Sequence, residues 1–250
     1  MARLPMPESV REALVRSTQT RDAVGGNRNA GILQRLSLDS WVFLRSGMRG
    51  TAGASPLPAA YGRSQAGAVW RFELLPQSRH LPEAFARISR ALVDEGESDL
   101  ALGLSAKPLA DLPFRAHAEA RITRRAGRTE IRPAGFVTAG VDRRHLPLDL
   151  ALRGYAQAGY VGGDFATGFA DGSLQIDREV ARFGLGQVRA GGGAWGGAQR
   201  GSARLDVGPT ASLGMRIGES PIRLSVDYRV RVAGDAAPGS GAALTLSTGF

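Results

Sequence analysis

Apolar and polar residues alternate along the last thirty residues of the chain. Every second residue from Ile222 to Val232 is apolar, and those between are polar or charged: Arg223, Ser225, Asp227, Arg229 and Arg231. Successive side chains of a β-strand point to opposite faces, so the pattern predicts a strand with one apolar and one charged face. After a turn-rich segment, 234–241, the alternation returns at Leu244, Leu246, Thr248 and Phe250.

The same period of two runs through the chain from Leu36 onward. Further clear strands are predicted at 65–75, 98–106, 113–124, 147–160 and 202–217, and less regular ones at 36–45, 84–94, 128–139, 168–180 and 185–196. The segment 84–94 also fits a helical stripe behind Pro82. Counted as a strand, it brings the total to twelve, an even number as in bacterial membrane barrels, with ten or fourteen as alternatives.

Short glycine-containing segments separate the predicted strands, at 125–127, 161–164, 196–198, 218–220 and 234–241. Such turns join antiparallel hairpins, and no predicted helix lies between them. Only 46–62 is long enough to act as a lid or binding loop. The glycine run 191–193 is expected to be a bend or a tight packing site inside a strand. The pattern therefore predicts an all-β fold, an antiparallel up-and-down closed transmembrane β-barrel.

A soluble antiparallel sandwich or barrel is the competing interpretation. In that fold the apolar faces would meet in a core and the charged faces would meet water. The apolar rows are rich in alanine and glycine, where a soluble core needs bulk, and the polar faces carry opposite charges on strand after strand. Both features favour a barrel with lipid outside and polar side chains inside, and hence an outer-membrane location.

The first 35 residues differ from the rest. A short helix is expected near 7–14 and a polar linker at 18–30, so residues 1–35 are assigned to an N-terminal segment and 36–250 to the barrel. No apolar run approaches the eighteen residues of a transmembrane helix. No secretory signal is present near Met1 either, so we expect an upstream region, with a misassigned start or export by another route as the alternatives.

Composition narrows the function classes. The net charge is +9, but Lys107 is the one lysine and the arginines are spread along the chain, which argues against nucleic acid as a partner. Cysteine is absent, which rules out thiol chemistry and Cys-based zinc sites. No phosphate loop, dinucleotide-binding motif or nucleophile elbow is present. No asparagine follows Asn29, so an outer-membrane serine–histidine–asparagine hydrolase is not expected.

The three histidines do not suggest catalysis. His117 lies on a charged strand face and is expected to be a hydrogen-bond partner in the lumen, while His80 and His145 fall in predicted turns and are expected to be solvated. Zinc would need two or three converging histidines. We therefore expect no enzyme activity, no metal and no cofactor.

Charged residues on the predicted inner face are the remaining candidate site. The predicted lumen residues are Arg71, Arg115, Glu119, Arg121, Asp149, Arg153, Arg204, Asp206, Arg223, Asp227, Arg229 and Arg231. Such residues can pair across strands and fill a narrow barrel, or an arginine ladder can favour the passage of anions. The interpretations left open are a structural or narrow passive barrel, the barrel part of an export or adhesion system, and a soluble basic binding protein.

Several longer segments carry a resemblance. Residues 155–159, 193–199, 204–209 and 229–246 look like parts of uncharacterised alphaproteobacterial proteins that resemble outer-membrane barrels. The resemblance implies an assembly signal, formed here by Leu244, Leu246 and the terminal Phe250, that the barrel-assembly machinery recognises. Outer-membrane lipid, including lipopolysaccharide, is the other expected partner. The resemblance implies no activity, and the oligomeric state is open.

Overall fold

The computed structural model describes residues 31–46, 64–92, 98–125, 128–163, 166–218 and 220–249. The expected N-terminal helix and linker, nearly all of loop 46–62, and Phe250 lie outside this range. A 3-10 helix, η1 (Ile32–Arg35), precedes twelve strands: β1 (Leu36–Arg45), β2 (Gln65–Glu73), β3 (Glu83–Ala91), β4 (Ser98–Ala106), β5 (Phe114–Arg125), β6 (Arg128–His145), β7 (Leu150–Val161), β8 (Thr167–Phe183), β9 (Gly186–Gln199), β10 (Ser202–Ile217), β11 (Ser220–Gly234) and β12 (Gly241–Gly249).

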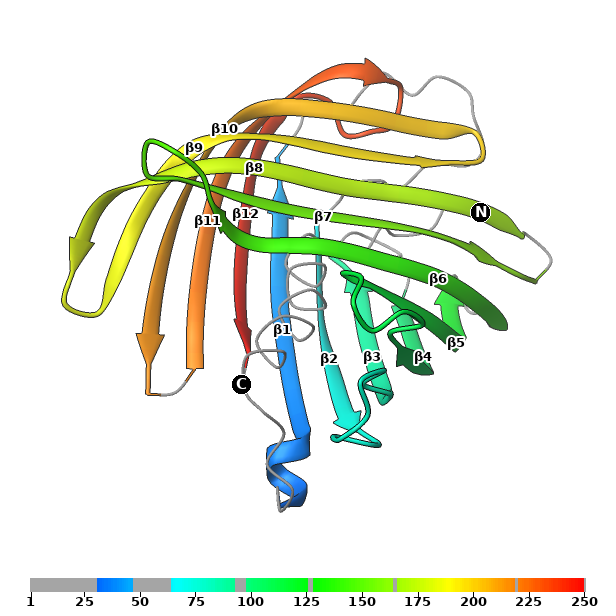
Figure 1. The fold of residues 1–250 in the computed structure, drawn as a ribbon. Helices are drawn as coiled ribbons and strands as arrows, with labels where there is room; N and C mark the ends of the chain where they lie inside the picture. The colour runs from blue at the N-terminus through cyan, green and yellow to red at the C-terminus, as the bar shows by residue number, and fades with distance from the viewer. Residues whose placement is uncertain are drawn as a thin grey trace.

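Each strand pairs antiparallel with the next along the chain, and β12 pairs with β1 to close the barrel. The twelve-strand, up-and-down prediction is confirmed, and the ambiguous segment 84–94 forms strand β3 rather than a helix. In Figure 1, β1 to β4 stand upright while β6 to β9 sweep across at a steep angle. The described residues contain no helix long and apolar enough to span a membrane.

The barrel has two ends. We call the end where β1 begins and β12 finishes the terminal end, and the opposite one the far end. Connections 74–82, 107–113, 146–149, 184–185 and 218–219 lie at the terminal end; connections 46–64, 92–97, 126–127, 162–166, 200–201 and 235–240 lie at the far end.

The alternation puts the apolar side chains outside. Leu102, Leu104, Val226 and Tyr228 are each at least half exposed, and similar residues follow on almost every strand. A soluble monomer rarely exposes apolar patches larger than a few hundred Å², and a continuous belt around the molecule requires lipid. The soluble interpretation needed these faces in the core, so the structure contradicts it. The fold is a transmembrane-type β-barrel.

The interior contains aromatic residues that the pattern did not predict. Trp41, Phe85, Phe136 and Trp195 are buried and point inward. Each lies beside a glycine of the inner face. The Trp41 and Phe85 rings pack over Gly67 and Gly103 on neighbouring strands, the Phe136 Cβ lies beside Gly159 on β7, and the Trp195 ring packs over Gly193 on its own strand. A Cβ on Gly193 would lie 2.6 Å from the Trp195 ring. The glycine run 191–193 is therefore a tight packing site inside β9, as expected.

Two local predictions are wrong. Gly196–Ala198 is not a turn, because β9 continues to Gln199 and the hairpin turns at Arg200 and Gly201, where Gly201 has a positive φ of 75°. Strand β7 begins at Leu150 rather than at residue 147. Leu148 and Asp149 have φ values of 64° and 57°, a left-handed conformation that fits a turn and not a strand.

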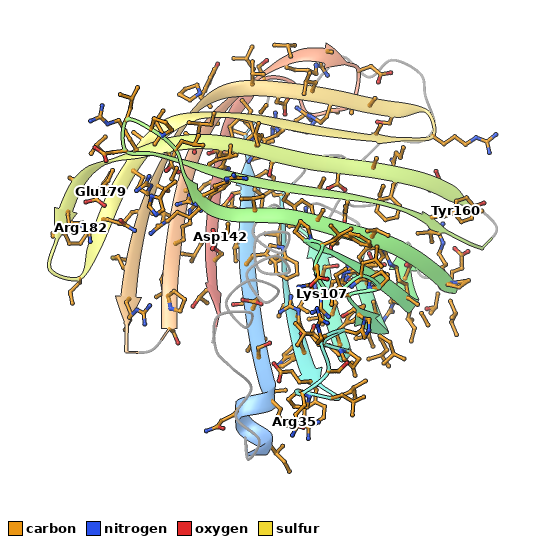
Figure 2. All side chains as sticks on the ribbon, in the orientation of Figure 1. Arg35, Lys107, Asp142, Tyr160, Glu179 and Arg182 are labelled. Carbon is orange, nitrogen blue, oxygen red and sulfur yellow. The ribbon has the colours of Figure 1, made fainter. Side chains whose placement is uncertain are left out.

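Helix η1 is fastened to the terminal end of β2. The Arg35 guanidinium donates to the Glu73 and Leu74 carbonyl oxygens, at 2.9 Å from Nε to Glu73 O and 2.8 Å from Nη2 to Leu74 O, and its Cζ lies 4.6 Å from the Phe72 ring centroid. Figure 2 labels Arg35 at this corner. The contacts hold the start of β1 against its neighbour.

Candidate functional site: the charged interior

Charged side chains fill much of the barrel interior. Among the described residues, nine arginines and seven carboxylates on the inner face are buried: Arg71, Arg87, Arg115, Arg121, Arg132, Arg153, Arg189, Arg204 and Arg229 with Glu83, Asp99, Glu119, Asp171, Asp177, Asp206 and Asp227. An ion taken out of water without a partner costs several kcal/mol, so the arrangement of partners decides whether the interior is stable.

Asp206 organises the far end. Its carboxylate accepts from Arg45 Nη1 at 2.9 Å and from Arg204 Nη2 at 2.8 Å. The same arginines hold the connection 235–240, because Arg204 donates to the Ala236 carbonyl oxygen at 3.3 Å and Arg45 to the Gly239 carbonyl oxygen at 3.2 Å. Ala236 is only 2% exposed. This connection therefore folds inward and narrows the far end of the lumen.

Arg229 lies deeper in the same half. It donates to the Asp227 carboxylate at 2.7 Å, and that carboxylate also accepts from the Thr210 hydroxyl at 2.7 Å. The guanidinium carbon lies 4.3 Å from the Trp195 ring centroid and 5.3 Å from that of Phe43. Cation–π contacts of this kind strengthen when they are removed from water. The Arg229 side chain is thus fixed on three sides.

A second carboxylate, Asp177, bridges β7 and β9. It accepts from Arg153 Nη1 at 3.0 Å and from Arg189 Nε at 2.5 Å. In this region Gln157 donates to Asp171 at 2.6 Å and accepts from the Tyr155 hydroxyl at 2.8 Å. The Gln157–Asp171 contact and both arginine contacts of Asp177 join neighbouring strands.

In the wall formed by β2 to β5, buried carboxylates are again paired with arginines. Glu119 lies between Arg87, at 3.0 Å, and Arg121. Closer to the terminal end Arg115 contacts Glu83 at 3.4 Å, and Arg71 is paired with Asp39 of β1. Asp99 accepts from the Thr123 hydroxyl at 2.5 Å.

His117 is a buried structural residue. Its Nε2 lies 3.0 Å from the Thr138 hydroxyl, and its ring stacks on Phe136 with a centroid distance of 4.5 Å. The prediction of a hydrogen-bond partner in the lumen is confirmed. His80 is exposed at the terminal end, where Nδ1 lies 2.8 Å from the Lys107 carbonyl oxygen, and His145 is exposed at the end of β6.

Most of the predicted lumen residues are where the pattern placed them. Nine are buried inside: Arg71, Arg115, Glu119, Arg121, Arg153, Arg204, Asp206, Asp227 and Arg229. Arg223 and Arg231 are half-buried; Arg223 donates to Gln175 at 3.3 Å and Arg231 to the Ala236 carbonyl oxygen at 3.0 Å. Asp149 is the exception, since it is exposed in the turn before β7. Arg153 instead pairs with Asp177.

Asp99, Asp177 and Arg189 also lie on polar faces of predicted strands, but six interior charges were missed: Asp39, Arg45, Glu83, Arg87, Arg132 and Asp171. They lie on β1, β3, β6 and β8, four of the strands with the least regular alternation. The spacing was informative even so, because Glu83, Phe85, Arg87 and Ser89 are successive inward positions of β3. The inward Phe85 hid the polar row, since an aromatic residue looks like part of an apolar face.

The interior carboxylates are paired with arginines, hydroxyls or, for Asp171, the Gln157 amide, rather than grouped together. Within the described part of the chain, no cluster of three histidine or carboxylate residues could hold a metal ion. The outward side chains Leu244 and Leu246 of β12 face the membrane side and pair with β1 and β11. The arrangement can brace the barrel wall and restrict passage through it.

Comparison with known proteins assigns this chain to no family. No family model matches the sequence, and no curated protein matches it. The alphaproteobacterial resemblance thus remains an expectation.

Solved structures with a similar fold include LpxR from Salmonella typhimurium (12% identity, TM-score 0.45, covering 86% of this chain and 99% of that one). The β-domain of the Bordetella autotransporter BrkA (11%, 0.44, 86% and 97%) and a bacterial polysaccharide outer-membrane secretin (7%, 0.43, 86% and 97%) are also similar. Scores this low carry no conclusion about activity, which has to be argued from the side chains of this chain.

Proposed function

We propose that this protein is a structural outer-membrane β-barrel whose charged interior leaves at most a narrow passive path for small solutes. The observation that carries the proposal is the interior itself. Buried arginines and carboxylates pair across strands, and Arg45, Arg204 and Arg231 hold the inward-folded connection 235–240. Paired charges that fill a small barrel brace its wall and exclude bulk water.

The orientation of the barrel in the membrane is inferred from the lengths of the connections between strands. Bacterial barrels have short periplasmic turns and longer extracellular loops. Two-residue connections occur at both ends, 184–185 and 218–219 at the terminal end and 126–127 and 200–201 at the far end, so the longest connection, 46–64 at the far end, decides the orientation. The proposal therefore places the terminal end in the periplasm and the far end outside the cell.

The competing functions fit the interior less well. The barrel part of an export system needs an open passage, and the inward connection 235–240 occupies that position at the far end. A soluble binding protein needs its apolar residues inside, and here they form the outer belt.

Conductance tests the proposal directly. The detergent-purified protein should be heat-modifiable on gels and should show little or no conductance in planar bilayers. The double substitution Arg45→Ala/Asp206→Ala removes the Arg45 contact with the Gly239 carbonyl oxygen and the carboxylate that orients Arg204. This loosens connection 235–240 and should raise conductance, with a preference for anions because Arg204 and Arg231 remain. Arg79→Ala/Asp111→Ala, at an exposed ion pair of 2.9 Å, is the matched control and should leave conductance unchanged. A large cation-selective conductance of the unmodified protein would overturn the proposal.

A further inference from the structure

We infer that the outer surface of β3 to β6, at the far end, is a binding site for the phosphorylated headgroup of lipopolysaccharide. The inference rests on the orientation proposed above, which puts this rim in the outer leaflet. The residues that carry it are Arg90, Ser98, Arg124 and Thr129. All four point outward, and the two arginines and Thr129 are exposed.

The strand register places the four residues in one row. Arg90 pairs with Ser98, Ser98 with Arg124, and Arg124 with Thr129. Neighbouring strands are about 4.8 Å apart, so the two arginines are separated by roughly 10 Å. Arginine, serine and threonine are all donors to phosphate oxygens, and a headgroup with more than one phosphate can engage both guanidinium groups at once.

The next row towards the barrel centre is wholly apolar. Ile88, Leu100, Ile122 and Ile131 are paired in the same order across the same strands, and all are 40–69% exposed. The change from donors to large aliphatic side chains within one row marks the boundary between headgroups and acyl chains. No described carboxylate points outward in either row.

A groove beside Arg90 provides space for an acyl chain. This cavity of about 400 Å³ on the outer surface of β12, β1, β2 and β3 is lined by Val42, Ala66, Ala68, Ile88, Arg90 and Leu246. Small side chains from β2 form its floor, and Arg90 lies at its far-end side. The row of donors that begins at Arg90 is therefore continuous with the apolar groove. An anionic lipid requires this arrangement, whereas a neutral partner does not.

The test measures lipid binding to the whole protein in detergent, by native mass spectrometry. The probes are lipopolysaccharide, phosphatidylglycerol and phosphatidylcholine. Arg90→Gln/Arg124→Gln should weaken lipopolysaccharide binding by roughly tenfold or more, since each surface arginine contributes to attraction of anionic lipid. The control Arg178→Gln/Arg200→Gln removes two exposed arginines outside the row and should bind like the unmodified protein.

A second pair of variants tests the groove. Ala68→Leu fills it and should also lower lipopolysaccharide binding, whereas Ala118→Leu, on the outer face of β5, should not. Equal binding by the unmodified protein and the double arginine variant would overturn the inference. So would phosphatidylglycerol binding as tight as that of lipopolysaccharide. Conductance of the same samples reports on the closed lumen separately, so failure of one proposal is distinguishable from failure of the other.

Discussion

At the scale of single residues, the protein keeps charges inside a membrane barrel by giving them fixed partners. Asp206 is 1% exposed and contacts Arg45 and Arg204, and Asp177 is 2% exposed and contacts Arg153 and Arg189. A carboxylate shared by two arginines is worth little as a net source of stability, but removal of the shared partner leaves two cations buried.

Asp206→Ala should therefore destabilise the barrel strongly. The expected loss is about 3–5 kcal/mol in the free energy of unfolding, the usual range for breaking a buried pair. Urea titration of the protein folded into lipid vesicles measures it. Asp111→Ala removes the acid of an exposed pair with Arg79 and should change stability by less than about 1 kcal/mol. Similar losses for both variants would show that Asp206 is not the centre of a buried network.

Two adjacent glycines test the inward aromatic packing. Gly193→Val places a side chain against the Trp195 ring and should destabilise the protein by about 1–3 kcal/mol, as overpacking does. Gly192→Val points outward, where the nearest atom to a new Cβ is 3.8 Å away, and should be close to neutral. Tryptophan fluorescence during urea unfolding measures the stability of both variants. A neutral Gly193→Val would mean that Trp195 can move away without cost.

At the scale of elements, inward aromatic residues accompany the weakest alternation, although β7 keeps a clear alternation with Tyr155 pointing inward. The five strands with the weakest alternation, β1, β3, β6, β8 and β9, all carry an inward aromatic residue: Trp41 and Phe43, Phe85, Phe136, Phe169 and Trp195. In β4 and β10, where no aromatic residue points inward, the predicted bounds 98–106 and 202–217 are those of the structure. An inward ring next to a glycine satisfies packing while it breaks the two-residue pattern.

The outward face of β4 offers a test of the membrane-facing surface. Leu102→Arg should lower the stability of the folded, lipid-inserted protein by about 2–4 kcal/mol, as a charge near the bilayer midplane does. Leu109→Arg, at an exposed position in connection 107–113, should have little effect. Folding yield into lipid vesicles measures the difference. If both variants insert equally well, Leu102 does not face the hydrocarbon.

At the scale of the whole molecule, closure between β1 and β12 joins the two ends of the described chain. Leu246 pairs with Val42 and Leu244 with Leu44 at this seam, and all four side chains are outward and exposed. The seam is complete only when the last strand has been added, which is why the final residues are suited to act as an assembly signal.

Deletion of Phe250 tests that role, which remains a prediction. In the exported form of the protein, the deletion should sharply lower the yield of heat-modifiable barrel in the membrane fraction. Phe183→Ala, which removes an exposed phenylalanine at the terminal end, should assemble normally. Undiminished assembly without Phe250 would contradict a signal at this position.

The sequence by itself determined the class of fold and most of the inner face, and it favoured twelve strands over ten or fourteen. These properties follow from a period of two, which is local and can be read residue by residue. The two-residue period failed to predict the structure where local backbone conformation or pairing with neighbouring strands overrides it. Asp149 lies outside the lumen because two left-handed residues, Leu148 and Asp149, precede the start of β7. Segment 196–198 is part of a strand because its glycines pair with residues of β8 and β10. Only the tertiary structure decided which charges pair, that connection 235–240 folds inward, and that Arg90 and Arg124 share one row, since these depend on the register between strands.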